Sequence, residues 1–435
     1  MESADQPRSM RPFFVVWLGQ LVSVTGTTIT AFGLQIYVFT ETGSVTQLTF
    51  VALAFVTPAL VLAPLAGSVV DRYDRRVVML VADACAGVAT LGLFIVWATG
   101  VLEPWHIYLA TAVGSSANAF QDPAWMAAVP LLVPKDQLGR ANGLVQLNQG
   151  LSFVLAPAIA GALLALGGLG PILIIDAATF AVGVATLALV RFPAYARTAG
   201  EDRSVWQDSV SAWRYLRIRS GLLGLLIIYA GVNFMLSATN VLVIPLIVSF
   251  STEAAAGAVL SIAGLGAVVG SLAVGVLGTP KRLVATIMGG IAVIGVFVSM
   301  VGMRESVVIV GIAATLLLFL NPVVNSSSQV IWQTKVEEGM QGRVFSLRRM
   351  LSSAVSPLAI FIAGPLADQI FEPMLAEDGA LADTVGTIIG TGPGRGIGFM
   401  YVVAGIGTVG LGIAGWLAPR VRNIETELPD LAGRS

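Results

Sequence analysis

Long runs of apolar residues without a charged side chain recur along the whole chain. A helix needs about 20 apolar residues to cross the hydrocarbon core of a bilayer, and most of these runs reach that length. Two further runs continue past a single aspartate. The pattern predicts an all-α membrane protein with twelve transmembrane helices, over Pro12–Thr40, Thr42–Val70, Ala84–Leu102, His106–Leu132, Leu144–Leu166, Pro171–Val190, Ser220–Thr252, Ala254–Pro280, Leu283–Met303, Ser306–Thr334, Phe345–Ala367 and Gly396–Pro419.

Basic residues gather on one side of these predicted spans. Short loops rich in Lys and Arg stay in the cytoplasm. With both termini inside, all but two of the 24 basic residues, Arg304 and Arg395, fall on the inner side, and Arg348 and Arg349 are assigned there. We therefore expect a multi-pass protein of the bacterial inner (plasma) membrane with both termini in the cytoplasm. The start of the chain is expected to be a retained tail and not a signal peptide.

The longest inner connection divides the predicted helices into two groups of six. A shift of 203 residues aligns Gly139–Arg140 with Gly342–Arg343, at matching depths in the two groups. Such duplication into two pseudo-symmetric bundles is typical of transporters. The expected organisation is a cytosolic tail (1–12), a six-helix bundle (13–190), a cytosolic linker (191–220), a second six-helix bundle (221–419) and a cytosolic tail (420–435).

The linker itself carries a helical pattern. Trp206, Val210 and Trp213 recur at helical spacing, with arginines close by. This pattern predicts an amphipathic helix that lies on the inner leaflet, and a solvated linker helix is the alternative.

Composition supports the membrane assignment and removes several functional classes. The chain is 56% hydrophobic and 11% charged, against roughly 45–50% and 25% in soluble domains. It has one cysteine and one histidine, so we expect no disulfide framework, no metal site and no cofactor. A net charge of −1 argues against nucleic-acid binding. Because the sequence shows no pairing of a nucleophile with a base, we do not expect an enzyme.

The connection after the second predicted helix carries a compact charged motif. Gly67 and Asp71 lie four residues apart on one helix face, so another helix can approach beside a carboxylate, which can accept hydrogen bonds from a helix N-terminus. Arg72, Arg75 and Arg76 follow, and a loop that only anchors topology is the alternative interpretation. Together these residues resemble the loop 2–3 signature of the major facilitator superfamily. In that signature Asp74 replaces the usual glycine, and Val77 replaces the last basic residue. The resemblance implies a gating loop that locks the outward-facing state.

The fifth predicted helix carries a second resemblance, to the antiporter motif of drug exporters in that superfamily. Its small residues and proline suit a helix that packs closely and pivots, although generic helix packing remains an alternative. The motif positions are Gly143, Ser152, Ala156, Pro157, Ala160 and Gly161. With the stretches Gly19–Thr30 and Gly139–Gln146, the chain resembles the twelve-helix drug/proton antiporter branch that includes macrolide exporters. One departure is that the fourth helix lacks the arginine that better-known branches of drug/proton antiporters carry there.

Aspartates inside predicted spans are candidates for proton coupling. A carboxylate at the centre of a span costs roughly 2.5–3.5 kcal/mol on insertion scales, so its retention indicates function or pairing. Asp122 and Asp176 are the candidates for carrying protons, and a hydrogen-bonded structural acid is the alternative. Asp83 and Arg343 are expected to form structural ion pairs near the inner surface. Asp368 is expected to be solvated at the outer end of its helix.

Polar residues on the remaining helices predict a central cavity. These candidates are Gln20, Thr27, Thr30, Gln35, Asn118, Asn233, Asn240, Asn325, Gln329 and Trp332, the last for stacking. No base is expected within the hydrocarbon core, which disfavours anionic cargo. Amides with one or two acids in an apolar cavity suit amphipathic neutral or cationic small molecules.

The function expected from the residues and the resemblance together is secondary active transport. We expect a monomer that exports drug-like or antibiotic-like compounds by alternating access, driven by proton antiport, and so contributes to multidrug efflux and antibiotic resistance. The alternatives are a lysophospholipid or siderophore transporter on the same fold, or a membrane sensor that uses a transporter fold.

Overall fold

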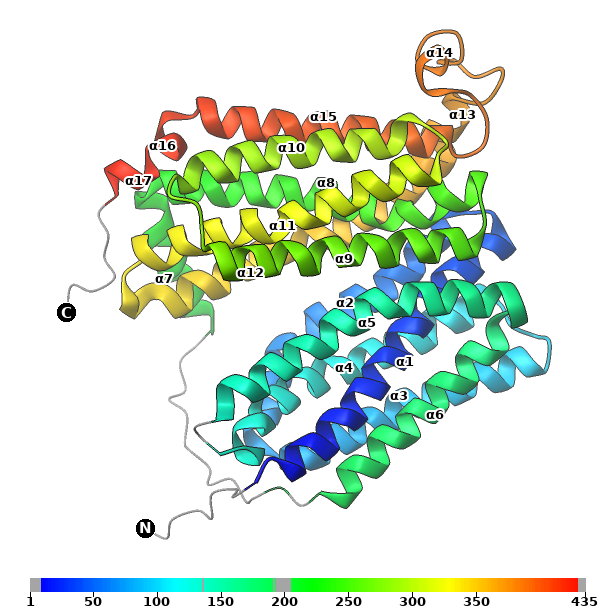
Figure 1. Ribbon diagram of the computed structural model, residues 1–435, viewed down its shortest axis with the longest axis vertical. Coiled ribbons are helices and arrows are strands. Elements are labelled where there is room, and N and C mark those ends of the chain that lie inside the picture. Colours follow the sequence, from blue (N-terminus) through cyan, green and yellow to red (C-terminus); the bar gives the residue numbers. More distant parts are fainter. Residues whose placement is uncertain (1–8, 135–136, 191, 193–204, 429–435) are drawn as a thin grey trace. The chain divides into compact units, whose positions relative to one another are not determined.

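Twelve long helices form the body of the protein (Figure 1). The computed structural model describes residues 9–134, 137–190, 192 and 205–428, and none of these residues forms a β-strand. The long helices are α1 (Arg11–Thr42), α2 (Val45–Arg72), α3 (Arg75–Ala98), α4 (Pro104–Leu132), α5 (Leu138–Gly167), α6 (Leu169–Leu189), α8 (Ser220–Phe250), α9 (Glu253–Leu277), α10 (Leu283–Met303), α11 (Val307–Lys335), α12 (Glu338–Leu366) and α15 (Arg395–Leu417). The prediction of twelve helices is confirmed.

Short helices connect or end the long ones. A π-helical turn over Ala367–Phe371 extends α12 at its far end. The others are α7 (Val205–Ile218), α13 (Glu372–Met374), α14 (Gly386–Ile389), α16 (Pro419–Arg422) and α17 (Ile424–Glu427). The helix predicted in the linker is therefore present as α7. The Trp206 side chain lies outside the described part of the chain, and Val210 and Trp213 are exposed.

Three helices begin six or more residues before the apolar runs indicate. α3, α5 and α12 start nine, six and seven residues before their predicted first residues. The first turn of α3 is capped by Asp74, whose carboxylate accepts a hydrogen bond from the Arg76 backbone N–H at 2.8 Å. A hydropathy run marks the part of a helix that suits lipid, whereas hydrogen bonds and caps decide where the helix begins. As a result, Arg348 and Arg349 lie about three turns inside α12 and not at its first turn.

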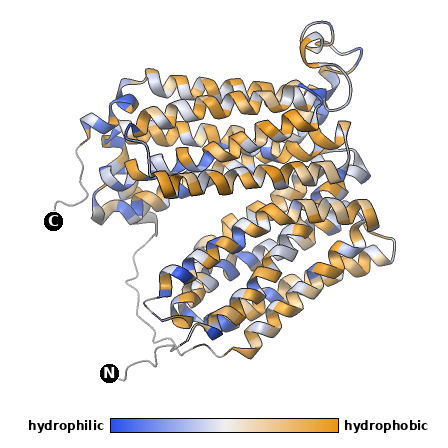
Figure 2. Ribbon diagram, viewed as in Figure 1, coloured by the Kyte–Doolittle hydropathy of each residue, from blue (hydrophilic) through white to orange (hydrophobic). Residues whose placement is uncertain are grey.

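Eleven of the helices that the structure describes are long and apolar enough to cross a membrane. The twelfth long helix, α4, carries polar side chains along its middle, and two of them, Ser115 and Gln121, are buried. Figure 2 shows hydrophobic residues over most of the length of the other long helices. The low hydropathy of α4 follows from polar groups that the protein interior, and not lipid, surrounds.

The chain divides into two compact units. The first unit contains α1–α6 together with Thr252–Ser261 at the start of α9, and the second unit contains α7, α8, the rest of α9 and α10–α17. In the first unit, one hydrophobic cluster is built around Phe13, whose ring stacks on Trp125 with centroids 5.9 Å apart.

A stripe of glycines brings α1 close to α6 in the first unit. Gly19, Gly26 and Gly33 are seven residues apart, and a Cβ atom on any of them would overlap a side chain of α6. At Gly26, the added atom would lie 2.9 Å from Cβ of Thr179. Packing of this kind, with small residues at the contact, is how helices associate where no hydrophobic force drives them together.

We expect Gly26→Ala to destabilise the protein by about 1–3 kcal/mol, because the new methyl group forces α1 and α6 apart. Gly92→Ala on α3 is the matched control, since a Cβ there meets nothing within 4 Å. Alanine is the better helix former, so this control is expected to be neutral or to stabilise by up to about 1 kcal/mol. Thermal unfolding followed by size-exclusion chromatography in detergent measures both effects. Equal melting temperatures for the two variants would contradict close packing at Gly26.

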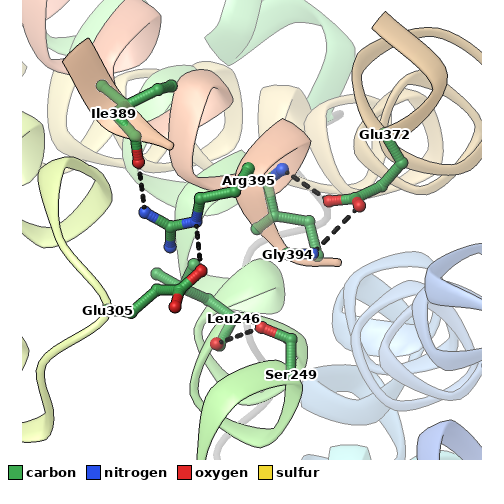
Figure 3. Close-up of polar contacts among 8 residues, drawn as sticks. Leu246, Ser249, Glu305, Glu372, Ile389, Gly394 and Arg395 are labelled. Atoms are coloured by element: carbon green, nitrogen blue, oxygen red, sulfur yellow. Dashed lines mark hydrogen bonds and ion pairs between the residues drawn. The ribbon is translucent and has the colours of Figure 1, made fainter. Parts of the chain in front are cut away.

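The end of the second unit where α15 begins is held together by Arg395, the first residue of α15 (Figure 3). Its side chain is 1% exposed, forms an ion pair with Glu305 at 3.1 Å and donates a hydrogen bond to the Ile389 carbonyl at 3.0 Å. Glu372 accepts hydrogen bonds from the backbone N–H groups of Gly394 and Ile397 and so caps α15. The sequence predicts Arg395 in a loop, whereas the structure makes it the first residue of α15 and buries it against Ile389, in the segment between α12 and α15.

Candidate functional site

The first unit contains a cavity of about 50 Å³ between α1, α2, α3, α4 and α6. Its wall is apolar on the side of Leu34, Phe55 and Leu93. The polar side chains that line it are Thr27, Thr30, Thr90, Thr111, Ser115, Asn118 and Asp176. Three of the residues predicted to line a cavity, Thr27, Thr30 and Asn118, therefore meet here with a predicted proton carrier.

Asp176 is the one charged residue in the wall of this cavity. Its side chain is 2% exposed, and Oδ2 accepts a hydrogen bond from the Thr90 hydroxyl at 2.8 Å. Within the described ranges, Oδ1 of the same carboxyl and the buried Thr30 hydroxyl have no hydrogen-bond partner. An ionised carboxylate that lacks a cation and a full set of hydrogen bonds is costly in such surroundings, and binding a proton removes that cost.

Asp83 is a second buried acid of the first unit, at 4% exposure. Its Oδ1 accepts a hydrogen bond from Nε2 of Gln121 at 3.1 Å, and the same Nε2 lies 3.1 Å from Oε1 of Gln20. Among the residues that the structure describes, its Oδ2 has no hydrogen-bond partner. The expected ion pair of Asp83 is therefore replaced by an amide contact, because Asp83 lies more than two turns inside α3 and not at its start.

The two buried acids lie along one seam between α3 and α6. Asp83 and Thr90 are seven residues apart on α3, which is about 10 Å along the helix axis. Thr90 bonds Asp176 on α6, and Gly183 of α6 faces Asp83, since a Cβ on Gly183 would lie 3.4 Å from Oδ2 of Asp83. This pairing of positions could not be seen in the sequence, where the two acids are almost a hundred residues apart.

Asp122 differs from both of these acids. It lies on α4, one turn after Asn118, but its side chain is exposed and does not line the cavity. Its role as a proton carrier stays a prediction.

Other predicted cavity residues are bound within their own unit. Gln20 is buried against Gln121, and the Gln35 amide donates to the Ala31 carbonyl of its own helix at 3.0 Å. In the second unit, Asn233 is half-buried and Asn240 is exposed on α8.

Trp332 is 1% exposed in this structure, and the stacking of its ring on a bound substrate stays a prediction. The guanidinium of Arg348 covers the ring, with Cζ 5.1 Å from the ring centroid. Arg348 also donates to Oε1 of Gln329 at 3.0 Å. Arg348 lies within the membrane-spanning candidate Met340–Met374, whose 35 residues exceed the length needed to cross the hydrocarbon core, so the expectation of a core without bases stays a prediction.

The charged residues after α2 tie the start of α3 to its neighbours. Arg75 donates to the Ala127 carbonyl of α4 at 2.8 Å, and Arg76 donates to the carbonyls of Leu187 and Ala188 at the end of α6. Cations at a helix C-terminus satisfy its free carbonyls. Gly67 and Arg72 are exposed, and the Asp71 side chain lies outside the described residues. Arg343 on α12 places Nη1 3.7 Å from the Met340 sulfur.

The motif on α5 lies mostly against other helices. Ser152, Ala156 and Pro157 are buried, and the Ser152 hydroxyl forms a hydrogen bond of 2.9 Å with Thr25 on α1. Ala160 and Gly161 are buried too, whereas Gly143 is exposed near the start of the helix.

Sequence comparison assigns the family. Residues 16–360 match the Major Facilitator Superfamily, so the chain belongs to this family of membrane transporters and not to an enzyme family. The expected resemblance is confirmed, and with it the multi-pass membrane fold.

Two named relatives match this chain over most of its length. Macrolide efflux protein A of Streptococcus pyogenes is 28% identical over 365 residues, which cover 82% of this chain and 90% of the relative. Multidrug efflux pump Tap of Mycobacterium tuberculosis is 26% identical over 375 residues, which cover 82% and 87%. The relatives that this chain resembles thus carry the word efflux in their names.

Solved structures share the fold. A bacterial homologue of the iron transporter ferroportin, in an inward-facing state, superposes with a TM-score of 0.70 at 16% identity, over 93% of this chain and 98% of the other. The nucleoside transporter NupG gives a TM-score of 0.68 at 14% identity, over the same shares. At such low identity the likeness concerns the fold alone.

Proposed function

We propose that this protein is an inner-membrane exporter of amphipathic neutral or cationic small molecules, with both termini in the cytoplasm, driven by proton entry. The observation that carries the proposal is Asp176, a buried carboxyl in a cavity wall with one oxygen unpartnered among the described residues. A carboxyl in this position can take up and release a proton as the surrounding helices rearrange, which links proton movement to a change of conformation. The efflux relatives support the direction of transport.

The roles of the remaining residues follow from their positions. Thr90 orients Asp176, and the Thr30 hydroxyl can bond the carboxyl when the helices shift. Asp83 with Gln121 and Gln20 extends the polar seam toward the start of α3. Arg75 and Arg76 hold α3, α4 and α6 together, so that the seam moves as one body.

Transport into proteoliposomes tests the proposal. Ethidium suits the assay, because its charge does not depend on pH and a pH gradient alone does not concentrate it. With the vesicle interior more acidic than the medium, we expect ethidium to accumulate inside and the interior to become more alkaline as it enters. Protein-free vesicles and a protonophore are the controls. Accumulation that the protonophore leaves unchanged would overturn proton coupling, and no transport under any gradient would overturn export.

A further inference from the structure

The second unit holds a guanidinium inside a membrane-spanning helix. Arg348 is the eleventh residue of α12, about 15 Å from the helix start. Ionisable residues at such positions are costly, face the protein interior or a water-filled cavity, and mark binding or transport sites. Arg348 lies in the second unit, apart from the buried acids Asp83 and Asp176 of the first.

Two contacts from α11 hold this guanidinium in one orientation. One face covers the ring of Trp332, with Cζ 5.1 Å from the centroid, and Nη1 donates to Gln329 Oε1 at 3.0 Å. Trp332 is fully buried in this structure, so its ring is a fixed support for the guanidinium. A guanidinium whose plane is fixed in advance loses less entropy when it binds a planar acceptor.

Most of the donors of Arg348 are unused. A guanidinium has five N–H groups, and in the part of the chain that the structure describes Arg348 makes one hydrogen bond and no ion pair. None of its nitrogens is among the buried polar atoms that lack a partner, and the side chain is half-buried. The free N–H groups are therefore accessible to a molecule that enters from outside the unit.

The approach to Arg348 is polar. Asn321, Asn325 and Gln329 follow one another at four-residue spacing on α11, and Asn325 donates to Asn321 at 2.5 Å. Lipid offers no hydrogen bonds, so a stripe of amides on a spanning helix must border protein or water.

The same shift of 203 residues that aligns the two halves places Asn325 opposite Asp122 and Arg348 opposite Val145. At these positions the second unit carries an amide where the first has an acid, and a base where the first has a valine.

We propose that Arg348, oriented by Trp332 and Gln329, is a subsite that binds a carboxylate group of the transported molecule. The planar fork of a guanidinium matches the two oxygens of a carboxylate, and hydrogen bonds between charged partners are about twice as strong as neutral ones. The cargo then includes zwitterionic and acidic amphipathic molecules in addition to neutral and cationic ones. Only the statement that the ligand is transported rests on the proposed function, since binding at Arg348 needs no proton gradient.

Equilibrium binding to the purified protein in phosphatidylcholine nanodiscs tests the subsite. The probes are indole-3-acetate and indole-3-acetamide, which differ in charge and hardly in shape. We expect the wild-type protein to bind the acid about tenfold more tightly than the amide. In Arg348→Gln we expect the preference for the acid to disappear while the affinity for the amide is unchanged. Arg348→Lys keeps the charge but lacks the planar fork of the guanidinium, so we expect it to retain part of the preference for the acid.

Arg349→Gln is the matched control, because it removes the same charge from the adjacent exposed residue of α12. It is expected to keep the full preference for the acid. The proposal is overturned if wild type shows no preference, if Arg348→Gln keeps it, or if Arg349→Gln loses it equally. Should phosphatidylglycerol in the nanodisc abolish the preference, the occupant is a lipid headgroup and the substrate subsite is overturned. Failure of ethidium transport would count against the proposed function and leave this binding result intact.

Discussion

Asp176→Asn is expected to abolish proton-driven accumulation of ethidium, down to the level of protein-free vesicles. Asparagine has the shape of aspartate and can still accept the hydrogen bond from Thr90, so the packing around the cavity is retained. What it cannot do is exchange a proton, and coupling requires a group that does. The variant should therefore fold, bind ethidium and exchange it across the membrane without a gradient, yet show no accumulation when the gradient is applied.

Two other acids make the result specific. Asp383→Asn changes an exposed acid in the turn that precedes α14, and it is expected to transport as wild type does. Asp122→Asn distinguishes the two proton carriers predicted from the sequence. If it abolishes accumulation while Asp176→Asn keeps it, Asp122 carries the proton and the role given to Asp176 is wrong.

Hydropathy predicts the existence of the helices better than their ends. The predicted span Leu283–Met303 coincides with α10, whereas α12 begins seven residues before the apolar run. That difference matters for the second unit, because it places Arg348 at the eleventh residue of its helix and not at the fourth. The length of an apolar run reflects the thickness of the bilayer. It does not include charged residues at the end of a helix, even where the helix continues through them.

For the buried acids Asp176 and Asp83, the sequence predicts burial better than it predicts hydrogen-bond partners. The cost of burying a carboxylate singled out Asp176 from the sequence, and the structure places it in a cavity wall. The same reasoning gave Asp83 a basic partner, because partners in a folded protein come from distant segments that a single sequence does not bring together. The Gln121 that bonds Asp83 is 38 residues away and carries no charge.

Arg304 and Arg395 differ in burial although the sequence predicts the same kind of position for both. Both were predicted to lie in outer loops, yet Arg304 is exposed and the side chain of Arg395 is 1% exposed. Arg395 joins three segments, since it forms an ion pair with Glu305 before α11, bonds the Ile389 carbonyl of α14, and begins α15 itself (Figure 3).

We expect Arg395→Ala to destabilise the second unit by about 3–5 kcal/mol, the range observed when one partner of a buried ion pair is removed. The Ile389 carbonyl loses its donor and a cavity replaces the guanidinium, so the connection between α12 and α15 is released from the helix ends. Arg304→Ala is the matched control and is expected to change stability by no more than about 0.5 kcal/mol. Thermal unfolding in detergent measures both.

A third variant separates the ion pair from the packing. Glu305→Gln leaves the guanidinium of Arg395 buried without its anion. Because water reaches the half-exposed Glu305 position, we expect this variant to lose more stability than Arg304→Ala and less than Arg395→Ala. Glu372→Gln tests the cap of α15 alone, at a cost of about 1 kcal/mol. If Arg395→Ala and Arg304→Ala unfold at the same temperature, Arg395 does not hold together the end of the second unit where α15 begins. If Glu305→Gln destabilises as much as Arg395→Ala, the ion pair and not the bond to Ile389 supplies that stability.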